Sequence, residues 1–428
     1  MQGDAVLRPP SAGILLTDYR GRLVANVGNP FYALATLVLL TLLPYLVPLE
    51  YMELIKVAGP GEHVLFCAVL GGVLFGLYAL YAALAEPRFD PRPERLGQGQ
   101  MEAMHKAMTA LMWTGLIANV AILAYTVPHF TGTIFSIKRS LQDLAGVNIL
   151  SQTYLFAIGP FIYLSLALGR PYRKLLVWLA VVLTLRAFLM AERLAFLEFA
   201  VPVLVCLSLL RELFVPVGRL VLIALGVPTL FVVMEIFRSF YSKFVESSGW
   251  AHLDLGFILQ WNLERLALYY ADVTNKFYFT LYNEYFHFTE YWIQGVLRMG
   301  SRLGLAEYEG RNELLAVIGQ FDAGNEEMTN PSGLATLLSD FGWWGLLVGL
   351  LIVAVLFVTH WRATRGHLIS LAFYPVLFLT LVEMPRFVYL YNSRALFPLA
   401  AFFAAYLAVS LMARPSVAPV PRDLEQGA

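Results

Sequence analysis

Two short stretches of the sequence place arginines beside carboxylates between long apolar runs. The first stretch contains Arg186, Glu192, Arg193 and Glu198, and the second contains Glu383, Arg386, Asn392 and Arg394. A charged side chain at bilayer depth costs about 2.5–3.5 kcal/mol on insertion scales, so charges in such places are candidates for function. Guanidinium groups hold phosphate oxygens through paired hydrogen bonds and stay charged at physiological pH. We therefore expect an anion site, and a lipid pyrophosphate would lie at this depth.

A second interpretation of the same residues is structural. The arginines would then pair with the neighbouring glutamates as ties between helices, or extend to lipid headgroups. If one helix continued through the first stretch, Arg186, Met190 and Arg193 would share a face at spacing i, i+4, i+7. The sequence alone leaves both interpretations open.

The elements that must position these charges are long apolar helices. Of the 428 residues, 59% are hydrophobic and only 14% are charged, whereas soluble domains carry charge on about a quarter of their residues. The apolar runs approach the length that a helix needs to cross about 30 Å of hydrocarbon. We predict an all-α polytopic membrane protein with about ten transmembrane helices and one large helical periplasmic loop. The predicted spans cover residues 31–48, 64–84, 107–127, 151–169, 175–190, 195–210, 221–234, 343–358, 369–382 and 395–412.

Basic residues set the predicted orientation. Sixteen of the 30 Lys and Arg fall in segments predicted to be cytoplasmic and seven in short outer loops, as the positive-inside rule expects when both termini are cytoplasmic. The run 174–210 is split into two spans because basic residues flank both of its ends. The run 368–412 is split near Pro385, which helps to break a helix. The predicted divisions are a tail at 1–30, helices one to seven at 31–234, the periplasmic loop at 235–342, helices eight to ten at 343–412 and a tail at 413–428.

The outer loop is rich in aromatic side chains between Trp261 and Trp292, and this stretch lacks Gly and Pro, which predicts a helix. Aromatic faces beside hydrogen-bonding side chains suit sugar rings, which have apolar CH faces and polar rims. The polar candidates here are Arg265, Asn283, Glu284 and His287. The alternative is an interfacial amphipathic helix whose aromatics lie at the membrane boundary.

Several other chemistries have little support in the sequence. The net charge is zero, so nothing indicates a nucleic-acid partner. No H-x-x-H, H-E-x-x-H or C-x-x-C pattern occurs, so we expect neither a metal site nor a cofactor. Cys67 and Cys206 lie inside apolar runs and are expected to be buried small side chains rather than a disulfide.

The segment from Thr329 to Gly345 reads TNPSGLATLLSDFGWWG. It resembles the end of the large periplasmic loop in O-antigen and exopolysaccharide repeat-unit polymerases of the Wzy type, where a polar turn with Ser and Gly leads to Asp-x-Gly-x-x-Gly at a late span. Those polymerases share the overall plan, and the hairpin with Arg186 and Arg193 looks like their arginine-bearing segment. The related O-antigen ligases usually place a histidine before the Gly-x-x-Gly. This sequence has Asn330 and Ser332 there, which favours a polymerase.

The resemblance implies metal-independent glycosyl transfer of the C-class membrane type at the outer face of a bacterial inner membrane. The donor would be a growing glycan on undecaprenyl pyrophosphate, and the acceptor a sugar hydroxyl of another lipid-linked repeat unit. A chain-length regulator is a further partner that this plan allows. The residues implied as catalytic are Arg186, Glu192, Arg193 and Glu284. Those implied in substrate binding are Arg265, Asn283, His287, Asn330, Ser332, Arg386, Asn392 and Arg394, with His287 also a candidate base.

Three alternatives remain beside the polymerase. The first is a ligase that moves finished glycan to another acceptor. The second is a lipid-linked-glycan flippase or transporter, which would carry polar groups near mid-membrane and inverted repeats with broken helices. The charges fall near one predicted surface and the sequence shows no paired repeat, so we favour an enzyme of the outer face. The third, a structural membrane partner, would leave the charge clusters unexplained.

Overall fold

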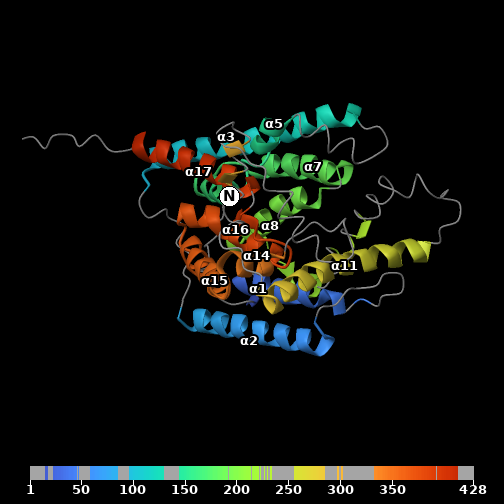
Figure 1. Cartoon of the computed structure of the whole chain (residues 1–428). Coiled ribbons are helices and arrows are strands. Elements are labelled where there is room, and N and C mark those ends of the chain that lie inside the picture. Colours follow the sequence, from blue (N-terminus) through green and yellow to red (C-terminus); the bar gives the residue numbers. More distant parts are fainter. Residues whose placement is uncertain are drawn as a thin grey trace, which may run out of the picture.

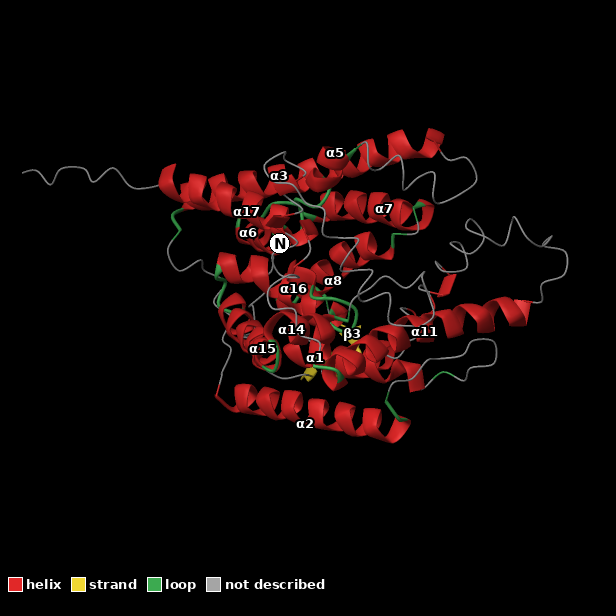
Figure 2. Ribbon diagram, viewed as in Figure 1, coloured by secondary structure: helices red, strands yellow, loops and turns green. Residues whose placement is uncertain are grey.

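The structure, a computed structural model, describes residues 15–17, 23–45, 58–84, 96–129, 144–190, 192–213, 215–220, 255–284, 332–391 and 393–412, with isolated positions at 47, 222–233 and 296–301. The described chain is almost entirely helical, which confirms the predicted all-α class (Figures 1 and 2). The longer helices are α1 (Pro30–Leu42), α2 (Pro60–Leu84), α3 (Gln98–Thr126), α6 (Ile158–Ala167), α7 (Arg173–Leu189), α8 (Arg193–Leu209), α11 (Leu255–Tyr282), α15 (Trp344–Ala363), α16 (Leu368–Glu383) and α17 (Ser393–Met412). The shorter ones are η1 (Leu43–Tyr45), η2 (Val127–His129), α5 (Ala145–Leu150), α14 (Gly333–Phe341) and η4 (Tyr389–Tyr391).

Four of the described helices are long and apolar enough to cross a membrane, namely α2, α3, α15 and most of α17. Four shorter apolar helices, α1, α6, α8 and α16, cover further predicted spans. The seventh predicted span, 221–234, lies mostly outside the described residues. These helices fit a multi-pass membrane protein, although the described part supplies four long spans rather than about ten.

One predicted span, 151–169, is broken in the structure. Helix α5 ends at Leu150, residues 151–157 form buried turns, and α6 begins only at Ile158. Irregular backbone at membrane depth must find hydrogen-bond partners within the protein, because lipid offers none. Here the amide of Asn119 donates to the carbonyl oxygen of Ser151 over 2.7 Å, and the hydroxyl of Thr153 donates to that of Leu111 over 2.9 Å. Helix α3 therefore provides hydrogen-bond partners for part of the broken segment.

The run 174–210 forms two helices, as predicted. Helix α7 ends at Leu189 and α8 begins at Arg193, so Arg186, Met190 and Arg193 do not share one continuous helical face. The backbone amide of Glu192 turns back to the carbonyl of Ala187 over 3.1 Å, which ends the first helix and opens a tight corner. The interpretation that required an unbroken helix is wrong for this reason.

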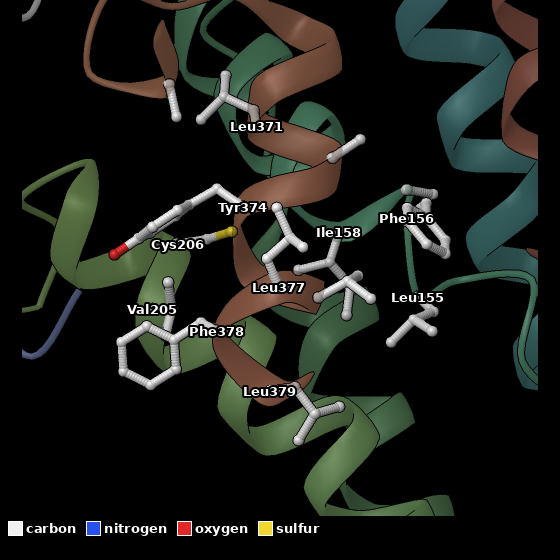
Figure 3. Packing of buried hydrophobic residues seen from close by; sticks show 14 of the residues in the cluster. Leu155, Phe156, Ile158, Val205, Cys206, Leu371, Tyr374, Leu377, Phe378 and Leu379 are labelled. Carbon is white, nitrogen blue, oxygen red and sulfur yellow. The ribbon is translucent and has the colours of Figure 1, made fainter. Parts of the chain in front are cut away.

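Helix α16 lies at the centre of the bundle and is buried along most of its length. Its Tyr374 lies beside Cys206 of α8, and its Leu377 lies beside Ile158 of α6 (Figure 3). Lipid tails are as apolar as leucine, so helix association in a membrane depends on close packing and hydrogen bonds. Gly159 permits such an approach, because a Cβ there would lie 2.1 Å from the carbonyl oxygen of Leu371. Cys67 and Cys206 are both buried and free, as expected.

Helix α2 lies at one edge of the molecule, where it packs mainly on α1 (Figure 1). Its outward side chains are apolar and exposed, including Leu65, Val69, Val73 and Leu80. An exposed apolar face of this length suits contact with lipid acyl chains.

A small antiparallel sheet ties the N-terminal segment to the chain after α8. It joins β1 (Leu15–Thr17), β2 (Leu23–Ala25) and β3 (Val215–Pro216), with Val24 paired to both Leu16 and Pro216. The predicted N-terminal tail is therefore partly structured, because its two short strands pair with each other and with β3.

Candidate functional site

Arg186 lies deep in the bundle with 1% of its surface exposed. Its Nε donates to Glu192 over 2.9 Å, and its Nη1 donates to Asn119 over 2.7 Å and to Ser151 over 3.0 Å. Its Nη2 donates to Asn148 over 2.9 Å and lies 2.8 Å from Glu192. A guanidinium has five N–H donors, and these contacts use all five. Arg186 therefore has no donor left for a ligand in this arrangement.

Glu192 joins the two arginines that the sequence analysis assigned to different hairpins. It precedes α8, and its carboxylate accepts hydrogen bonds from both Arg186 and Arg394. Burial would raise the pKa of Glu192, but the two guanidiniums outweigh burial and lower the pKa to about 2. A carboxylate with so low a pKa is a weak base at neutral pH. The geometry thus favours a counterion role for Glu192 over general base.

Arg394 completes the group, which we call the arginine–glutamate network and which consists of Arg186, Glu192, Glu198 and Arg394. Its Nε donates to Oε1 of Glu198 over 2.7 Å and its Nη2 to Oε2 over 2.8 Å, which is the paired geometry of a planar fork on a carboxylate. The hydroxyl of Tyr389 also donates to Glu198, over 2.8 Å. Two guanidiniums face two carboxylates, so the network is close to neutral.

The broken segment also reaches this network. With its amide oriented so that both groups find partners, Gln152 accepts from Nη2 of Arg394 over 2.9 Å and donates to the Arg394 carbonyl over 3.2 Å. Together with Ser151, it connects the turns between α5 and α6 to both arginines.

Arg386 forms a second group in the same hairpin, between α16 and η4. Its Nη1 donates to Glu383 over 2.6 Å and its Nη2 to the hydroxyl of Tyr269, with the guanidinium carbon 4.7 Å from the Tyr269 ring centre. Burial would lower the pKa of Arg386, but Glu383 and Tyr269 raise it above its ordinary value, so the group stays charged. Its Nε is buried and has no hydrogen-bond partner among the described residues. Unlike Arg186, Arg386 keeps donor capacity.

Helix α14, which forms the middle of the quoted motif, supports the turn that carries Arg386. Ser332 caps this helix, because its hydroxyl accepts from the amide of Ala335 over 3.4 Å. The next residue, Gly333, lies so close to the turn that a Cβ would be 2.3 Å from the carbonyl oxygen of Met384. Gly345 approaches Leu337 equally closely, with a Cβ 2.2 Å from its carbonyl oxygen. These glycines therefore have a packing role.

Helix α11, predicted from the aromatic stretch, runs from Arg386 towards the ends of α1 and α2. Tyr269 contacts Arg386, while the Tyr278 hydroxyl lies 3.1 Å from Nδ1 of His63, and the Tyr282 hydroxyl donates to Glu62. The end of α11 that lies away from α1 projects beyond the other labelled helices (Figure 1). All these partners lie on the side of the bundle predicted to be external. In each described ion pair, the two residues are predicted to lie on the same side of the membrane as each other.

The remaining sequence candidates lie elsewhere or outside the described part. Arg265 is half-buried on α11, and Asn283 and Glu284 are exposed in the turn that follows it. The structure does not bring these three into contact with the arginine–glutamate network. His287, Asn330, Asn392 and the side chain of Arg193 lie outside the described residues.

The sequence analysis missed the polar residues that surround Arg186. Asn119 lies in the third predicted span, Asn148 lies in α5, and Ser151 and Gln152 belong to the broken span. An asparagine within an apolar run is costly unless it is bonded, and that signal could have marked Asn119. The described residues hold no group of three or more His, Cys, Asp or Glu placed to bind a metal ion. No protein family, curated protein or solved structure was found to match the chain.

Proposed function

We propose that this protein is a membrane glycosyltransferase that polymerises oligosaccharide repeat units linked to undecaprenyl pyrophosphate, at the outer face of a bacterial inner membrane. The observation that carries the proposal is the Arg386 turn. It holds a buried, charged guanidinium whose Nε has no hydrogen-bond partner among the described residues, and it lies beside the aromatic helix α11 and against the start of α14. Such a group suits the pyrophosphate that leaves during glycosyl transfer.

The two arginine groups have different roles in this proposal. Arg386 contacts the phosphate oxygens and stabilises the charge that develops on them. The arginine–glutamate network fixes the corner of α7 and α8 against the start of α17, only eight residues after Arg386. Arg186 and Arg394 are then positioning residues, because Glu192 and Glu198 already occupy their forks.

A transporter of lipid-linked glycans is the second candidate, and one observation favours it. The buried turns at 151–157 interrupt a span, and broken helices are typical of transporter binding sites. These turns contact Arg186 and Arg394 directly. The neutral charge of that network argues against an anion site there, so we rank the enzyme first.

The test is gel analysis of surface glycan from a deletion strain, followed by purified protein and extracted lipid-linked repeat units. A polymerase predicts loss of long chains in cells, with single repeat units still attached, and chain growth in the purified reaction. Loss of all attached glycan would indicate a ligase or a flippase instead. Movement of lipid-linked glycan across vesicles without chain growth would identify the transporter and contradict the polymerase.

A further inference from the structure

Helix α11 carries a polar stripe on the face that contacts Arg386. Its members follow the spacing i, i+4, i+7, i+11 and i+15, which keeps them on one side of a helix. They are Arg265, Tyr269, Asp272, Lys276 and Thr280. Tyr269 binds Arg386, and Asp272 lies three residues further along the same side of α11.

Asp272 and Lys276 form a buried ion pair within this stripe. The ammonium of Lys276 donates to Oδ2 of Asp272 over 2.6 Å, and the two side chains are 6% and 3% exposed. A helix gains little from such a pair, because removing both charges from water costs more than their contact returns unless further bonds are made. Charged pairs kept in buried places are therefore candidates for chemistry.

Only one oxygen of the Asp272 carboxylate is hydrogen-bonded to another described residue. Oδ2 is bound by Lys276, whereas Oδ1 accepts no hydrogen bond from any other described residue. Burial raises the pKa of Asp272 and Lys276 partly offsets the rise. The carboxylates of Glu192 and Glu198, by contrast, are bound by arginine forks, and Glu383 is held by Arg386. A carboxylate held by an arginine is a poor proton acceptor, so Asp272 is better suited than these three.

We propose that Asp272 is the general base of the glycosyl transfer, a role that rests on the function proposed above. The acceptor hydroxyl loses its proton to Oδ1 of Asp272 as its oxygen bonds to the anomeric carbon of the donor. The bond from that carbon to the pyrophosphate oxygen breaks, and the pyrophosphate leaves with the electron pair towards Arg386. Lys276 balances the carboxylate before the transfer. Asp272 then releases its proton to water.

The spacing supports this division of labour. Three residues of α-helix rise by about 4.5 Å, so Asp272 lies less than one turn from the tyrosine that holds Arg386. A base for the acceptor and a cation for the leaving group would then flank a single reacting carbon.

The test uses purified full-length protein with lipid-linked repeat units extracted from the deletion strain. Asp272→Asn is expected to lower kcat by about 10²- to 10³-fold with little change in KM. Asp272→Glu keeps a carboxylate and is expected to recover part of the rate, with a shifted acidic limb in the pH profile. Glu212→Gln is the control, because its carboxylate bonds Tyr172 and Arg173 at the opposite end of the bundle and should leave kcat unchanged.

A structural role is separated by exchanging the pair. Asp272→Lys with Lys276→Asp restores the ion pair, and the unfolding temperature should return towards that of the native protein while the transfer stays low. Recovery of the transfer in this exchange, or a rate within a few-fold of native in Asp272→Asn, would overturn the proposed base. If the native protein itself elongates no chain, the polymerase function fails and the base fails with it.

Discussion

The arginine–glutamate network and the Arg386 turn place the same residue type in opposite conditions. In the network, Arg186 spends all five N–H donors on protein groups and Glu192 binds two guanidiniums. At the turn, Arg386 has one carboxylate, one hydroxyl and a buried Nε without a partner among the described residues. Burial of an arginine therefore does not by itself indicate a ligand site. The number of unused donors is the more informative quantity.

The largest expected effect comes from removing the centre of the network. Arg186→Ala leaves Asn119, Asn148 and Ser151 without their donor and Glu192 with one cation, so we expect a loss of about 3–5 kcal/mol in unfolding free energy. Thermal unfolding in detergent and the amount of protein in membranes measure this. Arg173→Ala is the control, because its pair with Glu212 is exposed and should matter little. An unchanged unfolding temperature for Arg186→Ala would contradict the structural role.

Arg386→Lys is expected to act on the reaction instead. The substitution keeps a charge beside Glu383 but removes the planar fork, so chain growth should fall by about 10²- to 10³-fold while the protein stays folded. Arg365→Lys is the matched control, since this arginine lies 3.7 Å over the Trp361 ring at the other end of the bundle. The reaction with extracted lipid-linked units provides the measurement. Polymer of normal length from Arg386→Lys would remove Arg386 from the mechanism.

The network also predicts how stability changes with pH. The folded-state pKa of Glu192 is lowered from 4.5 to about 2, so its stabilising contribution is complete above about pH 4.5 and is lost as the pH falls towards 2. The contribution is of order 3 kcal/mol. Unfolding temperatures measured between pH 7 and pH 3 should therefore decline more steeply in the native protein than in Glu192→Gln. Equal slopes would show that Glu192 is not held ionised by the two arginines.

The smallest expected effect concerns the support of the Arg386 turn. Gly333→Ala places a Cβ 2.3 Å from the Met384 carbonyl oxygen, so the turn must shift at a cost of about 1–3 kcal/mol. Chain growth should fall about tenfold. Gly76→Ala on α2 is the control, because nothing lies within 4 Å of a Cβ there. Equal activity of the two variants would show that α14 does not position Arg386.

The sequence predicted the helical class, several helix boundaries and the charged residues of the candidate site. Apolar runs and basic flanks predicted α7 and α8 as separate helices and predicted a break between α16 and α17. The arginines were visible as charges within apolar surroundings. The neighbouring glutamates were also visible as partners for these arginines. The asparagine partners were not, because the bonds of Arg186 to Asn119 and Asn148 depend on how α3, α5 and α7 pack rather than on any local pattern. The break at 151–157 was also missed, since buried turns carry the same apolar composition as a helix.

The short separation of six positions between Arg186 and Glu192 has a consequence for biogenesis. Both belong to one tight helical hairpin, so the ion pair can form as α7 and α8 leave the ribosome together. The hairpin can then partition into lipid with the charges of this pair already neutralised. Asn119, which also binds Arg186, belongs to α3 and is synthesised earlier. Arg394 arrives last in the chain and finds a carboxylate that is already in place. The order of synthesis thus allows the buried charges to pair one after another.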